Sequence, residues 1–450
     1  MWPTSGRVVI CAGINVRRRT LTARLSFIVS FRGGAIITRA SIASASIALA
    51  LLVASEGYAL STTVRSSAEP STRAAAVRLR VRVVAGSVTD VGSAAIAGSD
   101  SAAAAAAAKA TAPLTGYVAN YPAGTVTPFR MGANTAEPPI GVGSGPDAVA
   151  ITPNGNTAYV ASSAAGVVTP ISTRSDSAGS AIKVGGRPDA IAITPNGNTA
   201  YVASSATGVV TPISTRSNRA GRAIKIGRPG SYLIAITPNG NTAYVVSGAA
   251  GTVTPVRIAT NRAGRPIGIG RRGPYAIAIT PNGATVYVAD FAAGTMTPIR
   301  TATNRAGRAI KVGSGPDAIV ISPNSRTVYV ANDGPGTVTP VRTATNKAGR
   351  PIKVARLGPY AIAITPDSRT VYVAGYYAGI VTPIRTSTDR AAKAIKVGSG
   401  PIQIVVAADG KSAYVLSLLS GTVTPINTST NAAGPQVAVG RFPYALAITP

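Results

Sequence analysis

Eight equivalent positions of this chain, one in each copy of an internal repeat, include seven whose side chains could contact a ligand. The eighth position holds Ile402. The seven are the carboxylates and phenols of Asp147, Asp189, Tyr232, Tyr275, Asp317, Tyr360 and Tyr444. Their neighbours in the repeat are nearly constant, and variable loop residues on a fixed scaffold commonly carry binding. We interpret them as the mouth of a funnel for a carbohydrate, peptide or small ligand. The alternative is that they only cap the core and hydrogen-bond adjacent loops.

A second set of residues is basic and recurs with the same period, in loops that read Thr-Asn-Arg-Ala-Gly-Arg or a close variant. Its members are Arg219, Arg222, Arg262, Arg265, Arg305, Arg308, Lys347 and Arg350. Such a broken ring of positive charge could bind an acidic cell-wall polymer, an acidic polysaccharide or an acidic protein surface. Phosphate contacts alone can drive non-specific nucleic-acid binding, but no recognition helix or known motif is present, so we expect no specific recognition. The alternative is a solvated basic face without a partner.

Missing residue types exclude several classes of chemistry. The chain has no histidine, its only cysteine is Cys11, and its only tryptophan is Trp2, both outside the repeats. Zinc fingers, c-type haem attachment and His- or Cys-based catalysis in the repeats are therefore excluded. The aspartates at positions 147, 189 and 317 could in principle hold Ca²⁺, but the third lies several repeats from the others. We predict no catalytic residue, no metal site and no cofactor.

The repeat itself has a period of 42 to 43 residues and is written eight times between Gly116 and the C-terminus. A tyrosine marks each copy, at Tyr117, Tyr159, Tyr201, Tyr244, Tyr287, Tyr329, Tyr372 and Tyr414. A Thr-Pro pair follows in register each time. A fixed period of this length, filled with strand and turn signals, is typical of a propeller or a solenoid array.

Each repeat predicts four short antiparallel strands, as residues 188–227 show. Strand-like runs cover 190–193, 199–203, 209–215 and 223–226, and Thr194-Pro195-Asn196-Gly197 predicts a tight hairpin between the first two. Alanines and isoleucines alternate along the first run, so each sheet would have a thin face and a bulky face. Such sheets can pack radially as the blades of a propeller. Lysines on the fourth strand discourage edge-to-edge association.

The two ends of the repeat region are complementary. It begins with strands two to four at 117–143 and ends with strand one at 444–448. Three strands from the start and one from the end would complete an eighth sheet and close the ring without a disulfide. We therefore predict an all-β fold, a β-propeller of eight four-stranded antiparallel blades with 3+1 strand closure. Seven blades is the alternative, if a terminal unit does not join.

The motifs Tyr117-Val118-Ala119-Asn120 and Tyr329-Val330-Ala331-Asn332, followed by Gly-Thr-Val-Thr and Ile-Lys-Val-Gly, resemble the YVTN-type β-propeller repeat family. The resemblance covers 116–450 and implies an exported or surface-exposed propeller, generally without assigned catalysis. Lactonase-type propellers are more distantly similar. The chain departs from the family in two ways. Prolines replace an apolar residue of strand three, which predicts a recurring gap or bulge there. An acidic position holds arginine instead, at Arg130, Arg257, Arg300, Arg342 and Arg385.

Composition and the N-terminal region complete the interpretation. The formal net charge is +30, which bears on solubility and anionic partners and not on fold. Residues 1–59 read as a leader with a signal-peptide-like segment, a basic stretch followed by an apolar run at 42–53 and small residues up to Ala59. Residues 60–112 read as an Ala/Ser-rich disordered linker, and 113–450 as the propeller. The alternatives for the leader are an uncleaved anchor and an extension from a misassigned start codon, and no other transmembrane domain is predicted.

Together these observations predict a secreted or cell-surface, non-enzymatic and monomeric propeller that acts as a binding or surface scaffold. The runner-up is a lactonase-like or other hydrolytic enzyme that uses the Asp and Tyr residues at the channel mouth. The missing histidine and the scarcity of acidic residues argue against it.

Overall fold

The computed structural model of this protein describes residues 114–230, 232–270, 273–354 and 358–450 together with four earlier strands. Those strands are β1 (Arg24–Phe31), β2 (Gly34–Ser41), β3 (Ala59–Ser61) and β4 (Arg82–Val84), paired antiparallel as β1–β2 and β3–β4. The chain divides into two compact units, Met1–Thr89 and Asp90–Pro450. The predicted signal segment and linker lie largely outside the described residues and stay predictions.

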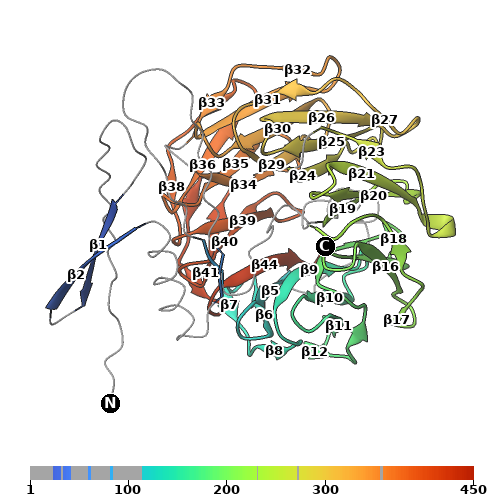
Figure 1. Cartoon of the computed structure of the whole chain (residues 1–450), viewed down its shortest axis with the longest axis horizontal. Coiled ribbons are helices and arrows are strands. Elements are labelled where there is room, and N and C mark those ends of the chain that lie inside the picture. The colour runs from blue at the N-terminus through green and yellow to red at the C-terminus, as the bar shows by residue number, and fades with distance from the viewer. Residues whose placement is uncertain are drawn as a thin grey trace. The chain divides into compact units, whose positions relative to one another are not determined.

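Residues 114–450 form eight sheets arranged as an eight-bladed β-propeller (Figure 1). Strand one of each blade contacts strand one of the next blade. From blade 1 to blade 8, strand one is β44 (Pro443–Ile448), β9 (Pro146–Ile151), β14 (Pro188–Ile193), β19 (Tyr232–Ile236), β24 (Pro274–Ile279), β29 (Pro316–Ile321), β34 (Pro359–Ile364) and β39 (Pro401–Val406). The predicted all-β propeller with eight blades is confirmed.

Strands two and three follow in each blade and pair without interruption. In the same blade order, strand two is β5 (Thr115–Asn120), β10 (Thr157–Ser162), β15 (Thr199–Ser204), β20 (Thr242–Ser247), β25 (Thr285–Asp290), β30 (Thr327–Asn332), β35 (Thr370–Gly375) and β40 (Ser412–Ser417). Strand three is β6 (Thr125–Arg130), β11 (Val167–Ser172), β16 (Val209–Ser214), β21 (Thr252–Arg257), β26 (Thr295–Arg300), β31 (Thr337–Arg342), β36 (Ile380–Arg385) and β41 (Thr422–Asn427).

Strand four is split into two halves of two residues each. The first half is β7 (Thr135–Ala136), β12 (Ser177–Ala178), β17 (Arg219–Ala220), β22 (Arg262–Ala263), β27 (Arg305–Ala306), β32 (Lys347–Ala348), β37 (Arg390–Ala391) and β42 (Ala432–Ala433). The second half is β8 (Ile140–Gly141), β13 (Ile182–Lys183), β18 (Ile224–Lys225), β23 (Ile267–Gly268), β28 (Ile310–Lys311), β33 (Ile352–Lys353), β38 (Ile395–Lys396) and β43 (Val437–Ala438). A 3₁₀ turn, η2 (Ile258–Thr260), precedes β22.

The prolines of strand three explain this split and correct the sequence prediction. Strand three has no gap or bulge at the proline, because Pro170 pairs directly with Tyr159 in an unbroken register. The gap lies in strand four instead. β12 pairs with Ile171 and Ser172, β13 pairs with Val167 and Val168, and nothing pairs between them. Since proline has no N–H to donate, the outer strand leaves the ladder opposite it, while the Pro170 carbonyl accepts a hydrogen bond of 2.7 Å from the Gly179 N–H.

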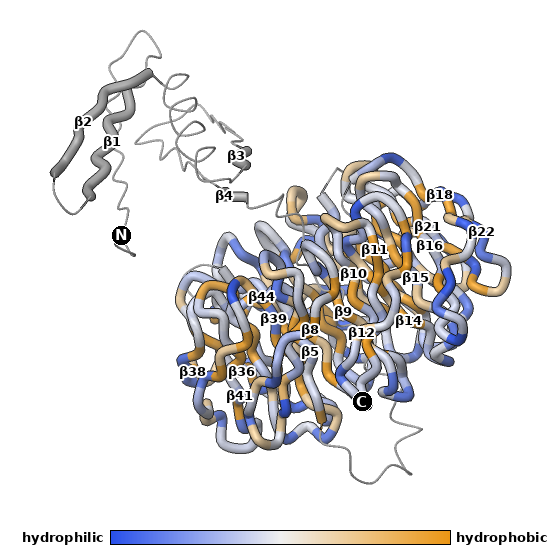
Figure 2. Tube along the Cα trace, turned by 90° about the horizontal axis from the view of Figure 1, so that it is seen from below, coloured by the Kyte–Doolittle hydropathy of each residue, from blue (hydrophilic) through white to orange (hydrophobic). Residues whose placement is uncertain are grey.

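The blades pack as the alternation of small and large residues predicts. Eight clusters of buried residues, one at each interface between blades, form the core. At the interface of blades 3 and 4, for example, Ala190 and Ala192 of one sheet share a cluster with Ile234 and Ile236 of the next. Apolar segments therefore run along the strands while polar residues lie in the connecting turns (Figure 2).

Ring closure uses the predicted 3+1 arrangement, in which the last strand, β44, pairs with β5. Gln403 in blade 8 stands where most other blades have alanine in strand one. Its Nε2 donates to the Leu446 carbonyl at 2.9 Å, and its Oε1 accepts from the Leu446 N–H at 2.7 Å. This side chain therefore fixes the C-terminal strand from the neighbouring blade. In the described residues, no helix has the length and apolar character to cross a membrane.

Candidate functional site

The two ends of the blades form two different surfaces. We call one the aromatic face, made by the loops that join strand two to strand three and strand four to the next blade. The other is the basic face, made by the turns between strands one and two and between strands three and four. The start of strand one lies at the aromatic face, and the end of strand three lies at the basic face, because neighbouring strands are antiparallel.

The predicted channel-mouth residues all lie at the start of strand one on the aromatic face. The sequence placed them just before the strand, but the structure places them within it. In seven of the eight blades the residue is the extra one of a β-bulge, as Asp189 is between Pro188 and Ala190. A bulge of this kind re-aims a side chain and is common beside binding sites. Tyr232 is the first residue of β19, and its side chain lies outside the described part.

Three of the channel-mouth tyrosines stack on an aromatic ring of their own blade. Ring centroids lie 5.2 Å apart in Tyr275–Phe291, 5.7 Å in Tyr360–Tyr376 and 5.3 Å in Tyr444–Tyr121. In each pair the second ring is the first residue of the loop between strands two and three. The six rings are partly buried. These contacts give the tyrosines a packing role, since such pairs contribute about 0.5–1.5 kcal/mol beyond burial; their role in ligand binding stays a prediction.

Two of the channel-mouth aspartates contact a serine that is the first residue of the strand two–three loop in their own blade. The Ser205 N–H donates to Asp189 Oδ2 at 3.2 Å. Asp147 has a hydrogen bond with Ser163. Burial raises the pKa of Asp147 to about 7, the negative charge of Asp189 adds to the rise, and Ser163 and Arg187 oppose it. Asp147 and Asp189 are thus electrostatic neighbours from blades 2 and 3.

Asp317 does not join this pair. It is buried in blade 6, while the other two aspartates lie in blades 2 and 3. Across the described ranges, no group of three His, Cys, Asp or Glu side chains could hold a metal ion. What Asp147 and Asp189 offer instead is hydrogen-bond acceptance, with one carboxyl that titrates near neutral pH.

On the basic face, the predicted cations lie partly in strands. Arg219, Arg262, Arg305 and Lys347 each begin the first half of strand four, where the sequence suggested a loop. Arg222, Arg265, Arg308 and Arg350 follow in the link between the two halves of strand four. All eight are exposed. They therefore share one solvent-facing surface.

Pairing of strands three and four brings arginines of strand three directly opposite three of these cations and opposite Arg390. The cross-strand pairs are Arg257–Arg262, Arg300–Arg305, Arg342–Lys347 and Arg385–Arg390. Like charges directly opposite each other destabilise a sheet. Blades 4 to 7 therefore carry four consecutive repulsive pairs, and in the described chain the strand-three arginines of these pairs have no ion pair with an acid.

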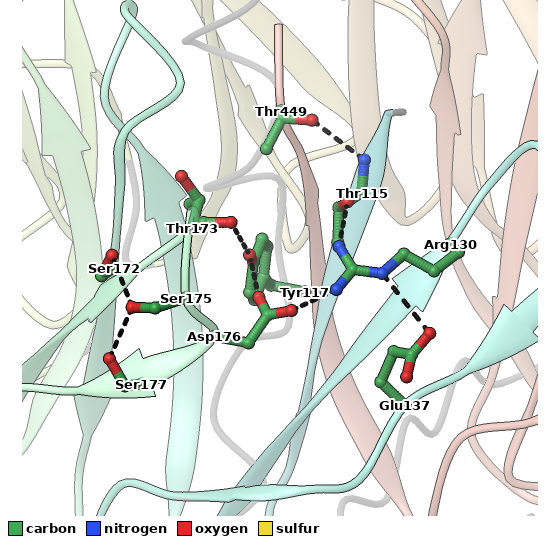
Figure 3. Close-up of polar contacts among 10 residues, drawn as sticks. All are labelled: Thr115, Tyr117, Arg130, Glu137, Ser172, Thr173, Ser175, Asp176, Ser177 and Thr449. Atoms are coloured by element: carbon green, nitrogen blue, oxygen red, sulfur yellow. Dashed lines mark hydrogen bonds and ion pairs between the residues drawn. The ribbon is translucent and has the colours of Figure 1, made fainter. Parts of the chain in front are cut away.

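In blade 1 the arginine at the end of strand three has acidic partners that neutralise its charge. Arg130 contacts Glu137 at 3.4 Å and pairs with Asp176 from blade 2, and its Nη1 donates to Thr115 Oγ1 at 2.9 Å (Figure 3). Asp176 also accepts a hydrogen bond from the Tyr117 hydroxyl. The pairing thus joins blade 1 to blade 2 near the site of ring closure, where Thr449 Oγ1 accepts from the Thr115 N–H at 3.0 Å.

Sequence reasoning missed that the repeated tyrosines clamp neighbouring blades together below the basic face. The hydroxyls of seven of the eight tyrosines donate to the Asn or Asp of the strand three–four turn in the next blade, at 2.6 Å in Tyr201–Asn261 and 2.7 Å in Tyr287–Asn346. Those turn residues are held at positive φ, which Asn and Asp tolerate. Burial raises the pKa of Tyr159 and Tyr372 to about 12, so the hydroxyls stay donors. The signal was available in the shared register of Tyr and Asn.

One interface departs from this rule, between blades 8 and 1. Tyr414 donates to the Met131 carbonyl at 3.3 Å, and the buried Oδ1 of Asn134 has no hydrogen-bond partner. An open cavity of about 590 Å³ lies there, lined by Asn134, Tyr414 and Leu114 among others. In blade 1 no hairpin joins strands one and two, because they come from opposite ends of the repeat region.

Comparison with known proteins supports the fold and goes no further. No family model matches the chain, and no curated protein matches it. Among solved structures, it is similar to hydrazine synthase of Kuenenia stuttgartiensis, with 22% identity, a TM-score of 0.53 and coverage of 63% of this chain and 96% of that chain. It is also similar to the dihydro-heme d1 dehydrogenase NirN, with 12% identity, a TM-score of 0.63 and coverage of 74% of both chains.

A third similar structure is AztD of Citrobacter koseri, with 13% identity, a TM-score of 0.58 and coverage of 75% of this chain and 98% of that chain. All three identities are low, so the likeness extends to the propeller and not to its chemistry. The chain is a β-propeller repeat protein by its own structure and by these neighbours.

Proposed function

We propose that this protein is an exported, non-enzymatic β-propeller that binds an anionic polymer across its basic face. The observation that carries the proposal is the row of four opposed cation pairs in blades 4 to 7, without acidic partners in the described chain. A polyanion laid across this row would convert four repulsive contacts into attractive ones. Blade 1 differs, because its strand-three arginine, Arg130, forms ion pairs with Glu137 and Asp176.

The strength of such binding follows from the number of cations. A basic side chain near an anionic surface contributes on the order of 1 kcal/mol, and the contribution fades within a Debye length. Blades 4 to 7 supply eight paired cations on one face, and the arginines and lysine that follow them in each blade add to the field. We therefore expect a polymer to bind firmly at low salt and weakly at high salt.

Export and the class of polymer rest on the sequence. The Tyr-Val-Ala-Asn repeats resemble the YVTN-type family, and the leader at 1–59 reads as a signal segment. A secreted or surface-attached protein meets acidic polysaccharides and cell-wall polymers, which are the partners we propose. We propose a monomer, since a net charge of +30 opposes self-association.

The test uses the full chain and fluorescently labelled polygalacturonate, with neutral dextran as the control polymer. Replacing Arg257, Arg300, Arg342 and Arg385 together by Gln should weaken polygalacturonate binding on the order of a hundredfold or more at low salt. The matched control replaces Lys183, Lys225, Lys311 and Lys353 by Gln. It removes the same charge from the second half of strand four, away from the basic face.

Equal weakening by the two quadruple variants would show that only net charge matters and would refute a site on the basic face. Binding that persists undiminished in 0.5 M salt, or equal binding to dextran, would refute an electrostatic mode altogether. Thermal unfolding of both variants serves to verify that the propeller is intact.

The runner-up function, hydrolysis at the channel mouth, has one observation in its favour. Asp147 has a pKa of about 7 beside a second carboxylate, as a general acid or base requires. If it holds, a lactone or ester screen on the full chain should detect turnover that Asp147→Asn abolishes and that changes with pH around 7. An absence of turnover across the screen would count against it.

A further inference from the structure

The aromatic face carries exposed apolar side chains on three consecutive blades. Among the described residues, the large apolar side chains with the greatest exposure are Tyr377 at 65%, Leu419 at 56% and Phe442 at 48%. They come from the strand two–three loops of blades 7 and 8 and from the loop that leads into blade 1. We call these three residues the apolar arc. Single exposed apolar residues are normal, but three on the loops of consecutive blades at one face are a feature that interaction sites share.

The arc is continuous with aromatic residues below it. Tyr376 and Leu418, each adjacent in sequence to an arc residue, pack against the cluster of buried residues between blades 8 and 1. Tyr376 also meets the Tyr377 ring edge-on, with centroids 5.2 Å apart. The Tyr121 N–H donates to the Phe442 carbonyl at 3.4 Å, and Tyr121 itself stacks on Tyr444. The exposed side chains are therefore next to residues that pack on the core between blades 8 and 1.

The position of each arc residue also depends on the loop that joins strand four to strand one of the next blade. A Cβ added to Gly358 would lie 2.5 Å from Tyr377 Cδ2, and one added to Gly400 would lie 2.6 Å from Leu419 Cγ. Both side chains thus sit directly on a glycine. In blade 1 the corresponding loop position holds Phe442 itself, with φ at 48°. A bulky residue at positive φ is strained, and strain of this kind clusters at functional sites.

The chemistry of the surrounding loops indicates the partner. In the described residues of the loops of blades 7, 8 and 1 on this face there is no Asp or Glu, and the only charged residue is Arg441. Blades 2, 3 and 6 instead present aspartates on the same face. A second copy of this chain is a poor occupant because both copies would carry +30. A fluid bilayer needs no fixed side chains, whereas a shaped partner gains from residues that are already ordered.

From these observations we propose that the apolar arc is a docking site for a protein segment with apolar or aromatic anchors flanked by carboxylates. Tyr and Arg are enriched where proteins bind each other, and a few anchor residues dominate such contacts. This site lies on the face opposite the basic face and does not rest on the proposed polymer binding. The protein would thus join an acidic polymer on one face to an acidic, apolar peptide on the other.

The experiment selects 12-residue peptides from a random phage-displayed library on the full chain and measures synthetic versions of the winners by fluorescence anisotropy. We expect peptides with aromatic or leucine anchors and Asp or Glu beside them. Phe442→Gly should weaken their binding about ten- to a hundredfold, because the exposed aromatic ring that the peptide would cover is lost. It should not unfold the protein, since glycine accepts the positive φ at this position. Tyr377→Ser and Leu419→Ser should act in the same direction.

The matched control is Ala164→Leu, which adds a leucine at the corresponding loop position of blade 2, beside Gly145. It should neither create a second site nor change binding at the arc. Failure to enrich any peptide, enrichment of basic peptides, or equal binding to Phe442→Gly would each overturn the proposal. So would arc-dependent binding to vesicles of phosphatidylcholine and phosphatidylglycerol, or an arc-dependent dimer in sedimentation equilibrium, because either would name a different occupant.

Discussion

The two faces of this propeller are built from the same repeat and yet differ in how they vary. On the basic face, blades 4 to 7 present nearly the same cations in the same register. On the aromatic face, the residue at the strand-one bulge changes from blade to blade, and so does the loop residue beside it. Repetition suits a diffuse field, because charges add without exact placement. Variation suits a local site, because each contact must differ from its neighbours.

The pairing on the aromatic face follows a rule that the repeat alone does not impose. Aromatic bulge residues have aromatic partners, as in Tyr275–Phe291, whereas Asp189 has the Ser205 N–H. Blades 1, 5 and 7 thus have aromatic pairs at this position, blades 2, 3 and 6 have aspartates, and blade 8 has Ile402. Blades 7, 8 and 1 are the most apolar part of it, and the apolar arc lies there.

The two faces also differ in where unfavourable interactions of the folded state lie. On the basic face each like-charge pair costs little, and tyrosine clamps such as Tyr244–Asn304 hold the blades below it. On the aromatic face the cost is concentrated in single residues. Asp147 keeps a carboxyl in a place that disfavours its charge, and Phe442 holds a strained backbone. Substitutions can test this contrast in order of expected effect.

The largest effect should come from Asp147→Asn. The unfolded carboxyl ionises near 3.8 and the folded one near 7, so between these values the unfolded chain binds fewer protons. The contribution of Asp147 to the free energy of unfolding is therefore fully present below about pH 4 and is lost as the pH rises to about 7. A three-unit shift corresponds to at most about 4 kcal/mol. Urea unfolding from pH 4 to 8 should show this fall in the wild type and a smaller one in the variant.

Ser163→Ala is the companion variant, since Ser163 lowers the pKa of Asp147. Its removal should raise that pKa further and extend the loss of stability to higher pH. A wild type and an Asp147→Asn variant with parallel stability profiles across this range would mean that the carboxyl is not disfavoured. Asp147 would then not be a destabilising residue of the aromatic face.

Much of this structure was predictable from periodicity, and the parts that were not depend on contacts between blades. Strand order, eight blades and 3+1 closure follow from a repeat of short strands whose phase differs at its two ends. The split of strand four did not follow, because Pro170 was read as a defect of its own strand and not of its neighbour. Gln403 departs from the alanine of most other blades, and only its hydrogen bonds to Leu446 place it at the ring closure.

The site was predictable in outline for the same reason. The positions of the cations and of the bulge residues are properties of register, which a sequence displays. Strain at Phe442 and the seating of Tyr377 on Gly358 are properties of loop conformation, and a single sequence does not display those. The sequence shows which residues depart from the repeat, but it does not show where their side chains point.

A middle-sized effect should come from giving blade 4 the arrangement of blade 1. Asn304→Asp puts a carboxylate at the turn position that Asp176 occupies three repeats earlier, near Tyr244 and the unpaired Arg257. The residue keeps its positive φ of 52°, which Asp tolerates. We expect a gain in stability of about 0.2–1 kcal/mol at pH 7 and a several-fold loss of polygalacturonate affinity, measured by thermal unfolding and anisotropy.

Asp176→Asn is the reverse experiment and should release Arg130 from its partner in blade 2. It should lower stability and raise polymer affinity slightly. If neither variant changes polymer binding, neutralised and unneutralised arginines are equivalent on this face, and the comparison between blade 1 and blades 4 to 7 loses its meaning.

The smallest effect should come from Arg300→Gln, which removes one member of the repulsive pair with Arg305. Like charges directly opposite cost a few tenths of a kcal/mol up to about 1 kcal/mol, so the variant should unfold at a slightly higher temperature in 0.01 M salt. The gain should disappear in 1 M salt, where the Debye length is about 3 Å. Arg130→Gln, at the same position of blade 1, should instead lower the unfolding temperature, because it removes attractive contacts to Glu137 and Asp176. If the unfolding temperature rises for Arg300→Gln and falls for Arg130→Gln, the charge of the basic face is kept at the expense of stability. If both variants shift the unfolding temperature in the same direction, solvent already screens the repulsion between the paired arginines.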